Sequence, residues 1–307
     1  MKHVVIFNPA AGSGRAARHR EAVEQVLATR DLDVEVQESE RSAHAVEMAE
    51  RAASRAGAVV AAGGDGTVQE VARGLLRARE EAALGVLPLG TGNDFVKAAG
   101  IPTNWRDAAR ALASSETAML DVGRVRWRGD ERGERCFVNA VGVGFDAQVA
   151  RAARSATRLR GTAAYLAGVL RTLRRWEGPE ATVRAGKRGA VLHDGPLFLV
   201  TLGNGTCSGG GFYLTPTASP DDGALDLCLI EDLSVARVGQ IIPLVFRGRH
   251  APEPEVTMHR VRSARIESEA GLPIHADGEV LAERARRIEV ETLPGRLPVR
   301  RPLITPT

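Results

Sequence analysis

Three glycine-rich segments in the first hundred residues carry the residue types that bind phosphate groups. They read Asn8-Pro9-Ala10-Ala11-Gly12-Ser13-Gly14, Gly63-Gly64-Asp65-Gly66-Thr67 and Gly90-Thr91-Gly92-Asn93-Asp94. Glycine lets backbone amides approach an anion closely, and a helix N-terminus adds unpaired N–H donors and the positive end of a dipole. Each segment follows a short apolar run and precedes a helix-like stretch. Together they predict a phosphate site at one edge of a parallel sheet.

The second segment also contains a carboxylate, Asp65. A carboxylate beside bound phosphates usually acts through a metal ion, so Asp65 either holds Mg²⁺ or lies beside an acceptor hydroxyl. The first segment is not a P-loop, because no Gly-Lys-Ser/Thr ends it. Its structural alternative is an ordinary strand-to-helix turn with Ser13 as the N-cap.

The elements that must position these segments alternate along the chain. Apolar β-type runs at 4–7, 34–36, 58–62 and 85–89 are separated by alanine-rich helical patterns at 14–29, 42–55 and 67–79. This alternation predicts an α/β domain over residues 1–118, with a parallel sheet covered on both faces. Ligands of such sheets bind beyond the carboxyl ends of the strands, where all three segments fall.

The pattern changes after residue 118. Short β-type runs follow at 119–127, 135–143, 181–185, 196–203, 224–230, 256–261, 264–268 and 286–292. Turn signals separate many of them, which predicts a β-sandwich-like second domain over residues 119–292. Two helices are expected to interrupt it, near 161–176 and 234–246.

The composition narrows the class of protein. With 307 residues and 44% hydrophobic residues, the chain can bury a substantial core, and its net charge of +3 is too small to indicate nucleic acid binding. Cys136, Cys207 and Cys228 lack metal or redox spacing and are expected to be buried thiols in a reducing compartment. No signal peptide or membrane-spanning stretch is found in the sequence, so the expected location is cytoplasmic.

The ordered motifs resemble the diacylglycerol kinase catalytic domain, and more closely the bacterial soluble lipid kinases related to diacylglycerol, sphingosine and ceramide kinases. The resemblance continues through the second half, at Phe145-Asp146-Ala147, Gly209-Gly210-Gly211, Thr215-Pro216, Asp222-Gly223 and Asp277-Gly278-Glu279. It implies an ATP- and Mg²⁺-dependent kinase that phosphorylates a lipid alcohol, such as diacylglycerol. It also implies that a C-terminal tail, residues 293–307, packs back on the first domain.

The resemblance places ATP against all three glycine-rich segments. The implied contacts are Asn8, Gly12, Ser13, Gly14, Arg15, Ser39, Gly63, Gly64, Asp65, Gly66, Thr67, Val68, Gln69, Thr91 and Asn93. Gln69 stands where the family usually has Asn, and this amide exchange is expected to be tolerated. A solvated turn serine is an equal alternative for Ser39, and Asp94 is expected to act as a helix cap.

Asp277-Gly278-Glu279 is the candidate catalytic element, together with Asp65. Phosphoryl transfer to an alcohol needs a group that accepts the hydroxyl proton. Taken alone, Asp-Gly indicates a hairpin turn. With the resemblance, the same turn is expected to serve as hairpin and active site, with either Asp277 or Glu279 as the base.

The resemblance also implies a structural Mg²⁺ in a turn of the second domain. Its ligands would be the Asp222 side chain and the carbonyls of Ser219 and Ala224, a set that suits Mg²⁺ because this ion keeps several waters. The alternative is a metal-free β-turn.

Residues 151–176 are basic and amphipathic, with arginines that include Arg171, Arg174 and Arg175 beside Trp176. Such stretches can lie on anionic membrane surfaces, which predicts a peripheral membrane contact and a lipid substrate. The alternative is a core-packed helix with a solvated arginine face. Two rival functions remain: an NAD kinase, which shares the Gly-Gly-Asp-Gly segment, and a catalytically silent lipid-binding protein.

Overall fold

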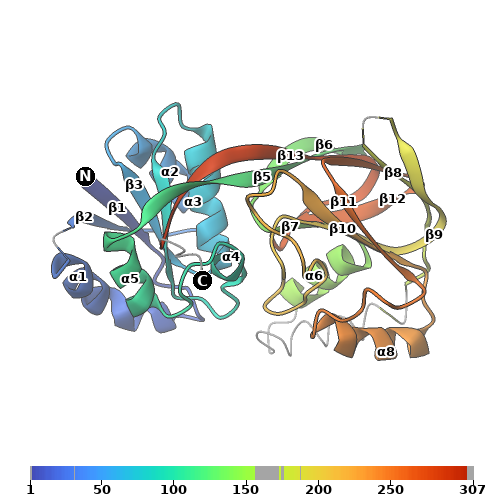
Figure 1. Cartoon of the computed structure of the whole chain (residues 1–307), viewed down its shortest axis with the longest axis horizontal. Helices are drawn as coiled ribbons and strands as arrows, with labels where there is room; N and C mark the ends of the chain where they lie inside the picture. Colours follow the sequence, from blue (N-terminus) through green and yellow to red (C-terminus); the bar gives the residue numbers. More distant parts are fainter. Residues whose placement is uncertain (1, 31, 156–172, 174–175, 187, 303–307) are drawn as a thin grey trace. The chain divides into compact units, whose positions relative to one another are not determined.

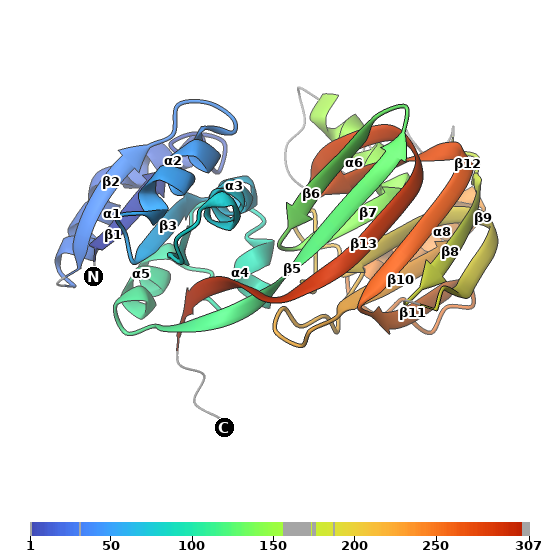
Figure 2. The same cartoon turned by 90° about the horizontal axis from the view of Figure 1, so that it is seen from above.

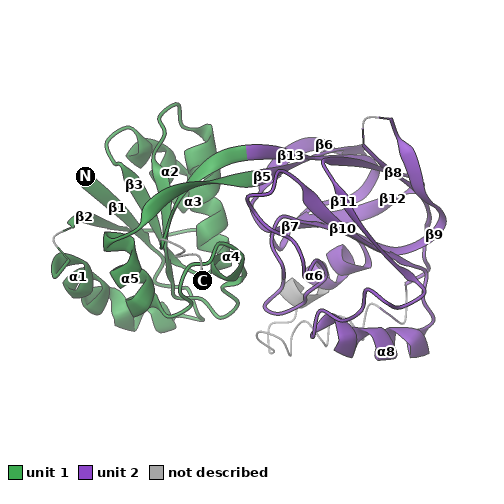
Figure 3. Ribbon diagram, in the orientation of Figure 1, with its two compact units in different colours: residues 1–121, 295–307 green, residues 122–294 purple. Residues whose placement is uncertain are grey.

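The structure is a computed structural model that describes residues 2–30, 32–155, 173, 176–186 and 188–302 (Figure 1). The chain divides into two compact units (Figure 3). Unit 1 comprises residues 1–121 and 295–307, and unit 2 comprises residues 122–294. Among the described residues, no helix is long and apolar enough to cross a membrane.

Unit 1 contains a parallel sheet in the order β2-β1-β3-β4. Its strands are β1 (Lys2–Phe7), β2 (Asp33–Glu38), β3 (Ala58–Gly63) and β4 (Ala83–Pro88). Every residue of β3 and β4 is buried, as expected for parallel strands that are covered on both faces. The far end of β13 (Glu279–Arg301) continues this sheet, because Val299 pairs in parallel with Leu84.

Helices cover the sheet in two pairs (Figures 1 and 2). The helical elements are η1 (Arg15–His19), α1 (Arg20–Ala28), α2 (His44–Ala53), α3 (Asp65–Arg77), α4 (Asp94–Ala98) and α5 (Trp105–Ala113). α2 packs on α3 and α1 packs on α5. Gly74 allows the first contact, since a Cβ there would lie 2.4 Å from the carbonyl oxygen of Val46. The predicted α/β architecture is confirmed, although the helix expected over 14–29 begins as a 3₁₀ turn.

Unit 2 is rich in antiparallel strands, as predicted. They are β5 (Glu116–Gly129), β6 (Arg132–Phe137), β7 (Ala140–Gly144), β8 (Glu180–Ala185), β9 (Ala190–Gly203), β10 (Leu225–Glu231), β11 (Val256–Val261) and β12 (Ser263–Ala276), followed by β13. The strands pair in the order β11-β10-β9-β7-β12-β13, and β8 pairs with β9 and β12. The helices are α6 (Phe145–Ser155) and α8 (Val235–Val245).

Two hydrophobic clusters stabilise unit 2. Val200 and Leu202 of β9 belong to a cluster that includes side chains from β5, β7, β12 and β13. Phe198 and Leu199 belong to the second cluster, which includes Val238 and Ile241 of α8. β9 therefore contributes side chains to both clusters. The helix expected near 161–176 lies outside the described residues, except for Leu173 and Trp176.

Candidate functional site

The three glycine-rich segments follow neighbouring parallel strands and contact one another. We call them loop 1 (8–15), loop 2 (63–67) and loop 3 (90–94). The Asn8 side chain donates from Nδ2 to Oγ1 of Thr67 at 2.9 Å, which joins loops 1 and 2. β1, β3 and β4 end at Phe7, Gly63 and Pro88, so their carboxyl ends lie at one sheet edge. The meeting of the loops at this edge is as the sequence predicts.

Close backbone contacts require glycine at two of these loop positions. A Cβ on Gly90 would lie 2.5 Å from the Cα of Gly64, so loops 2 and 3 pack backbone against backbone. A Cβ on Gly12 would lie 2.8 Å from the carbonyl oxygen of Leu89, and Gly12 has a φ of +59°. Both distances are too short for a side chain, which explains why the loops are rich in glycine.

Loop 1 has three consecutive residues in the left-handed region, with φ values of +59° for Gly12, +63° for Ser13 and +83° for Gly14. Gly14, not Ser13, is the N-cap of η1, and it makes no side-chain cap. Within the described part of the chain, the backbone N–H groups of Gly12 and Ser13 make no hydrogen bond. Arg15 donates from Nε to the Gly12 carbonyl at 2.9 Å. Loop 1 therefore offers free amides and an exposed guanidinium, which are donors for an anion.

Asp65 lies in the first turn of α3 and accepts hydrogen bonds from the first two residues of α4. Its Oδ1 accepts from the backbone N–H of Asp94 at 2.6 Å and of Phe95 at 3.2 Å. Burial raises the pKa of Asp65 above its ordinary value, and the negative charge of Asp94 raises it further, against the effect of the backbone donors. The expectation that Asp94 caps its own helix is wrong: the N-cap of α4 is Asn93, and the acceptor comes from Asp65.

The donor set around Asp65 fits a magnesium ion that is held mainly by phosphates. Asp94 is 3% exposed and forms an ion pair with Lys97 at 3.1 Å. Among the described residues, no group of three or more His, Cys, Asp or Glu side chains is placed to hold a metal ion. Mg²⁺ usually binds one or two carboxylates and completes its shell with water and substrate phosphates, so a single carboxylate such as Asp65 fits a site of this kind.

Several predicted nucleotide contacts are buried side chains. Thr67 is 4% exposed, and Val68 and Gln69 are each 3% exposed. The Gln69 Nε2 atom has no hydrogen-bond partner among the described residues. Any nucleotide contact of Val68 and Gln69 in this arrangement would therefore involve their backbone, because their side chains pack inside unit 1.

Three further predicted contacts lie at the same sheet edge or in loop 3. Ser39 follows β2 and donates its backbone N–H to the Phe7 carbonyl at 2.9 Å. It is buried, so the alternative of a solvated turn serine is wrong. Thr91 is exposed at the tip of loop 3. Asn93 has a φ of +52° and donates from Nδ2 to the Gly90 carbonyl at 3.2 Å, so it orders loop 3.

A cavity of about 280 Å³ adjoins loops 1 and 3. Arg15, Gly90 and Asn93 line it together with His19 and Trp105. The His19 and Trp105 rings lie 5.6 Å apart. Neither Ser39 nor loop 2 lines this cavity, so it unites only part of the predicted nucleotide set.

Asp277 lies at the turn between β12 and β13, where the predicted hairpin is present. Asp277 and Gly278 have φ values of +46° and +80°, and Ala276 pairs with Glu279. The Asp277 carboxylate accepts three backbone N–H groups at 2.9 Å, from Val138 to Oδ2 and from the next two residues, 139 and 140, to Oδ1. Burial nevertheless raises the pKa of Asp277 to about 6.

These bonds correct one sequence expectation. Residues 135–143 were expected to form one strand, but β6 ends at Phe137 and β7 begins at Ala140. The N–H groups of Val138 and Asn139 turn toward the Asp277 carboxylate, so the strand is interrupted there. The anchored carboxylate is thus built into the backbone of unit 2.

Glu279 forms an ion pair with Arg135 of β6. No local sequence pattern indicates Arg135 as the partner, since the two residues lie 144 positions apart. Nearby on β12, the His275 Nε2 atom lies 3.3 Å from Oδ2 of Asp146, which also accepts from the Thr201 hydroxyl at 3.0 Å. His275, Asp146 and Thr201 thus form a polar cluster. Asp146 belongs to the Phe145-Asp146-Ala147 motif, and this motif was the sequence feature that could have indicated the cluster.

The predicted metal turn is held by an arginine. Oδ2 of Asp222 lies 2.7 Å from Arg260, and Oδ1 accepts from the Ala224 N–H at 3.0 Å. Ser219 donates its hydroxyl to Asp221 at 2.8 Å. A magnesium ion on Asp222 would have to displace Arg260, and the metal ligands Ser219, Asp222 and Ala224 stay a prediction.

Comparison with known proteins identifies the family. Residues 2–125 match the diacylglycerol kinase catalytic domain, and residues 139–301 match the YegS C-terminal NAD kinase beta sandwich-like domain. The chain belongs to the diacylglycerol kinase family of lipid kinases. It is 35% identical over 252 residues to a "Probable lipid kinase YegS-like" of Pseudomonas aeruginosa, covering 81% of this chain and 78% of the relative.

A second family member and two solved structures extend the comparison. The chain is 30% identical over 306 residues to a "Diacylglycerol kinase" of Mycobacterium tuberculosis, covering 98% of this chain and 95% of the relative. A diacylglycerol kinase structure from Bacillus anthracis covers 98% of this chain and 97% of its own, with a TM-score of 0.73 and 21% identity. A yeast NADH kinase in complex with NADH has a TM-score of 0.55 at 12% identity, over 98% of this chain and 82% of its own. These last two likenesses show the fold alone.

Proposed function

We propose that this lipid kinase transfers the γ-phosphoryl group of ATP to the hydroxyl of a lipid alcohol, diacylglycerol or a close relative, with Mg²⁺ as the metal. The observation that carries the proposal is the contact of three glycine-rich loops around Asp65 at one sheet edge. The relatives named lipid kinase and diacylglycerol kinase support the acceptor class.

The free amides of Gly12 and Ser13, together with Arg15, would hold the phosphates of ATP. Bound Mg²⁺ would neutralise charge on the β- and γ-phosphates, and Asp65 is the residue that would hold it, directly or through water. Backbone N–H groups of Asp94 and Phe95 already fix the Asp65 carboxylate, so it would need little side-chain reorganisation to meet the metal. Positioning of this kind supplies much of the catalysis in phosphoryl transfer.

Asp277 is our choice for the general base. A carboxylate has about four lone-pair sites, and three N–H groups occupy three of those on Asp277, so Oδ2 keeps one. A pKa of about 6 suits a base that works near neutral pH. The acceptor hydroxyl would give its proton to Oδ2 as its oxygen bonds to phosphorus and the bond to ADP breaks. Glu279, held by Arg135, would orient the hydroxyl.

An apolar cavity in unit 2 favours a lipid acceptor over NAD. It is lined by Phe145, Phe198 and Phe212 and by residues of α8, with Asp146 as its one charged member among the described residues. The cavity holds only about 50 Å³, so an acyl chain must displace lining side chains to enter. The basic segment 151–176, which we propose as the membrane contact, lies largely outside the described residues.

Transfer of labelled phosphate from ATP tests the proposal. The purified chain is incubated with γ-labelled ATP, Mg²⁺ and, in separate reactions, diacylglycerol in detergent micelles, a total lipid extract, or NAD. Label in diacylglycerol or another lipid is the expected result, with D277N as the inactive control. Label in NAD would favour the NAD kinase, and no label in any lipid would favour a silent lipid-binding protein.

A further inference from the structure

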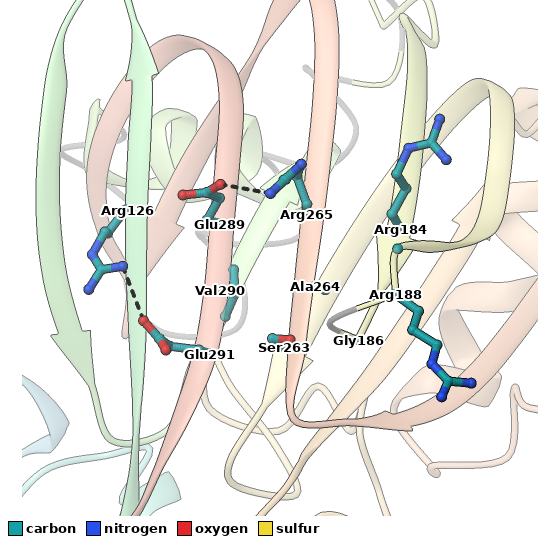
Figure 4. Close-up of a pocket in the computed structure, with 11 residues that line it drawn as sticks. Arg126, Arg184, Gly186, Arg188, Ser263, Ala264, Arg265, Glu289, Val290 and Glu291 are labelled. Carbon is teal, nitrogen blue, oxygen red and sulfur yellow. Dashed lines mark ion pairs between the residues drawn. The ribbon is translucent and has the colours of Figure 1, made fainter.

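A groove of about 390 Å³ on unit 2 carries a surplus of positive charge (Figure 4). Its charged lining consists of four arginines and two glutamates: Arg126, Arg184, Arg188, Arg265, Glu289 and Glu291. The volume falls within the range of about 300–1,000 Å³ that is typical of small-molecule sites. The groove is at the start of β12, at the opposite end of that strand from Asp277. It is therefore not part of the proposed catalytic turn.

Strand register places like charges side by side in the groove. Arg184 of β8 pairs with Arg265 of β12, and Arg265 pairs with Glu289 of β13. Like charges directly opposite one another on a sheet are destabilising. An anion bound between Arg184 and Arg265 would relieve the repulsion between these two side chains.

The carboxylate nearest Arg265 is shared with another arginine. Glu289 lies 3.3 Å from Arg265 but 2.7 Å from Arg287. Arg287 is also the main cause of the lowered pKa of Glu289. Because the longer of these ion pairs is on the surface, it contributes little stability, and an anion can compete for Arg265.

On the β13 side of the groove, Glu291 is likewise shared between two arginines. Glu291 lies 3.3 Å from Arg126 but 2.6 Å from Arg124. Arg126 has its closer partner in Glu134, at 2.5 Å. The two groove glutamates are thus shared with arginines outside the groove, and Arg126 is compensated by Glu134. The uncompensated positive charge of the groove is that of Arg184 and Arg188.

The Arg184 and Arg188 side chains make no ion pair or hydrogen bond with any described residue, and Figure 4 shows both extending from the β8 side. The turn that carries Arg188 is fixed by the Gly186 N–H, which donates to the Ser263 carbonyl at 2.8 Å. Ser263, the first residue of β12, lies between Glu291 and Gly186 in Figure 4, and its hydroxyl also makes no hydrogen bond within the described residues. The groove therefore offers two guanidinium groups and one hydroxyl as available donors.

These donors match a phosphate group. The planar guanidinium of arginine binds phosphate through two parallel hydrogen bonds, and a serine hydroxyl adds a third type of donor. No aromatic side chain lines the groove among the described residues, so it has no stacking surface for a nucleobase.

We propose that this groove binds the phosphate group of a small polyol phosphate or of an anionic phospholipid headgroup. The site is independent of the nucleotide loops, because all its residues belong to unit 2. It therefore does not depend on the proposed catalytic activity.

Binding measurements on the whole chain test the groove without using activity. Glycerol 3-phosphate and inorganic phosphate are titrated by calorimetry, and sedimentation is measured with phosphatidylglycerol vesicles and with phosphatidylcholine vesicles. R184Q/R188Q is the test variant, and S263D, which places a negative charge in the groove, is a second. R247Q/R249Q is the matched control, since it removes the same charge from exposed arginines of unit 2 that do not line the groove.

The expected result is at least about tenfold weaker binding by both test variants and unchanged binding by the control, in line with the strength of charge-assisted hydrogen bonds. An effect on glycerol 3-phosphate identifies a soluble ligand. An effect confined to phosphatidylglycerol vesicles identifies a lipid headgroup. The proposal is overturned if the wild type binds none of the probes, if the test variants bind as well as the wild type, or if the control loses binding equally.

Discussion

The Asp65 carboxylate accepts a hydrogen bond from the backbone N–H of Asp94 at 2.6 Å. A residue of loop 2 therefore supplies the acceptor for the first N–H group of α4, the helix that follows loop 3. The two residues lie 29 positions apart in the sequence. A single carboxylate therefore ties loops 2 and 3 together, and under the proposed function the same carboxylate would hold the metal ion.

This double role predicts different outcomes for two substitutions of Asp65. Asp65→Asn keeps an acceptor oxygen but loses the charge, so turnover should fall on the order of 10²–10⁴-fold while the free energy of unfolding changes little. Asp65→Ala should lose similar activity and also about 1–3 kcal/mol of stability, because two buried N–H groups lose their acceptor. Kinetic assays and urea unfolding check both. Retention of about a tenth of wild-type turnover by Asp65→Asn would contradict the metal role.

The glycine contacts between loops 2 and 3 predict a contrast between two alanine variants. Gly90→Ala should destabilise unit 1 and weaken ATP binding, because its Cβ would lie 2.5 Å from the Cα of Gly64. Gly66→Ala is the matched control for stability, since nothing lies within 4 Å of its Cβ and the residue is helical. It is not a control for ATP binding, because Gly66 is itself an implied ATP contact. Thermal unfolding and nucleotide titration measure both effects. Equal stability of the two variants would show that the loops are not packed as described.

The raised pKa of Asp277 predicts how the rate depends on pH. A base must be deprotonated, so kcat should rise with pH through about 6 and then level off. Carbon-13 NMR of the Asp277 carboxyl should give the same midpoint, which separates it from Asp65, whose pKa is also raised. A carboxyl that titrates near 3.8, its ordinary value, would remove the argument for Asp277 as the base.

The same pKa predicts a change in stability. Because folding raises the pKa of Asp277 from 3.8 to about 6, its protonated form favours the fold. Its contribution to the free energy of unfolding is present below 3.8 and is lost as the pH rises through about 6. Urea unfolding across this range should show the loss in the wild type and in E279Q, but not in D277N. If the free energy of unfolding of D277N shows the same pH dependence, another group is its cause.

The turn at 219–224 predicts competition between magnesium and Arg260. If Asp222 is a metal ligand, removal of Arg260 should strengthen Mg²⁺ binding, because the arginine occupies the carboxylate at 2.7 Å. Thermal shift measurements with increasing Mg²⁺ check this. The rise in unfolding temperature that comes from this turn should be largest in R260Q and absent in D222N. Identical magnesium responses in the wild type, R260Q and D222N would leave a metal-free turn.

Local signals were enough to predict much of unit 1 from the sequence. The run 58–62 is continuously apolar, as a strand buried on both faces requires, and the adjoining glycines mark the loop that follows it. What the sequence did not predict were contacts between distant residues. The bonds from Val138, Asn139 and Ala140 to Asp277 span 137 to 139 positions, and no local pattern shows that this carboxylate divides the strand expected over 135–143.

The site shows the same limit. The sequence marked Asp277 and Glu279 through their motif, but it gave neither the Arg135 partner nor the burial that raises the pKa of Asp277. Asp94 was expected to cap its own helix, since an aspartate near a helix start usually does so. The structure instead gives that role to Asp65, because the close backbone contact between Gly64 and Gly90 brings the two loops together.

The most direct test of the account compares ATP binding and phosphoryl transfer in D277N, E279Q and the wild type. If the loops of unit 1 hold the nucleotide and Asp277 takes the acceptor proton, D277N should bind ATP in calorimetry with wild-type affinity. Its transfer of labelled phosphate to diacylglycerol should fall on the order of 10²–10⁴-fold, with a smaller loss in E279Q. A loss of ATP affinity that matches the loss of rate, or normal transfer by D277N, would contradict the account.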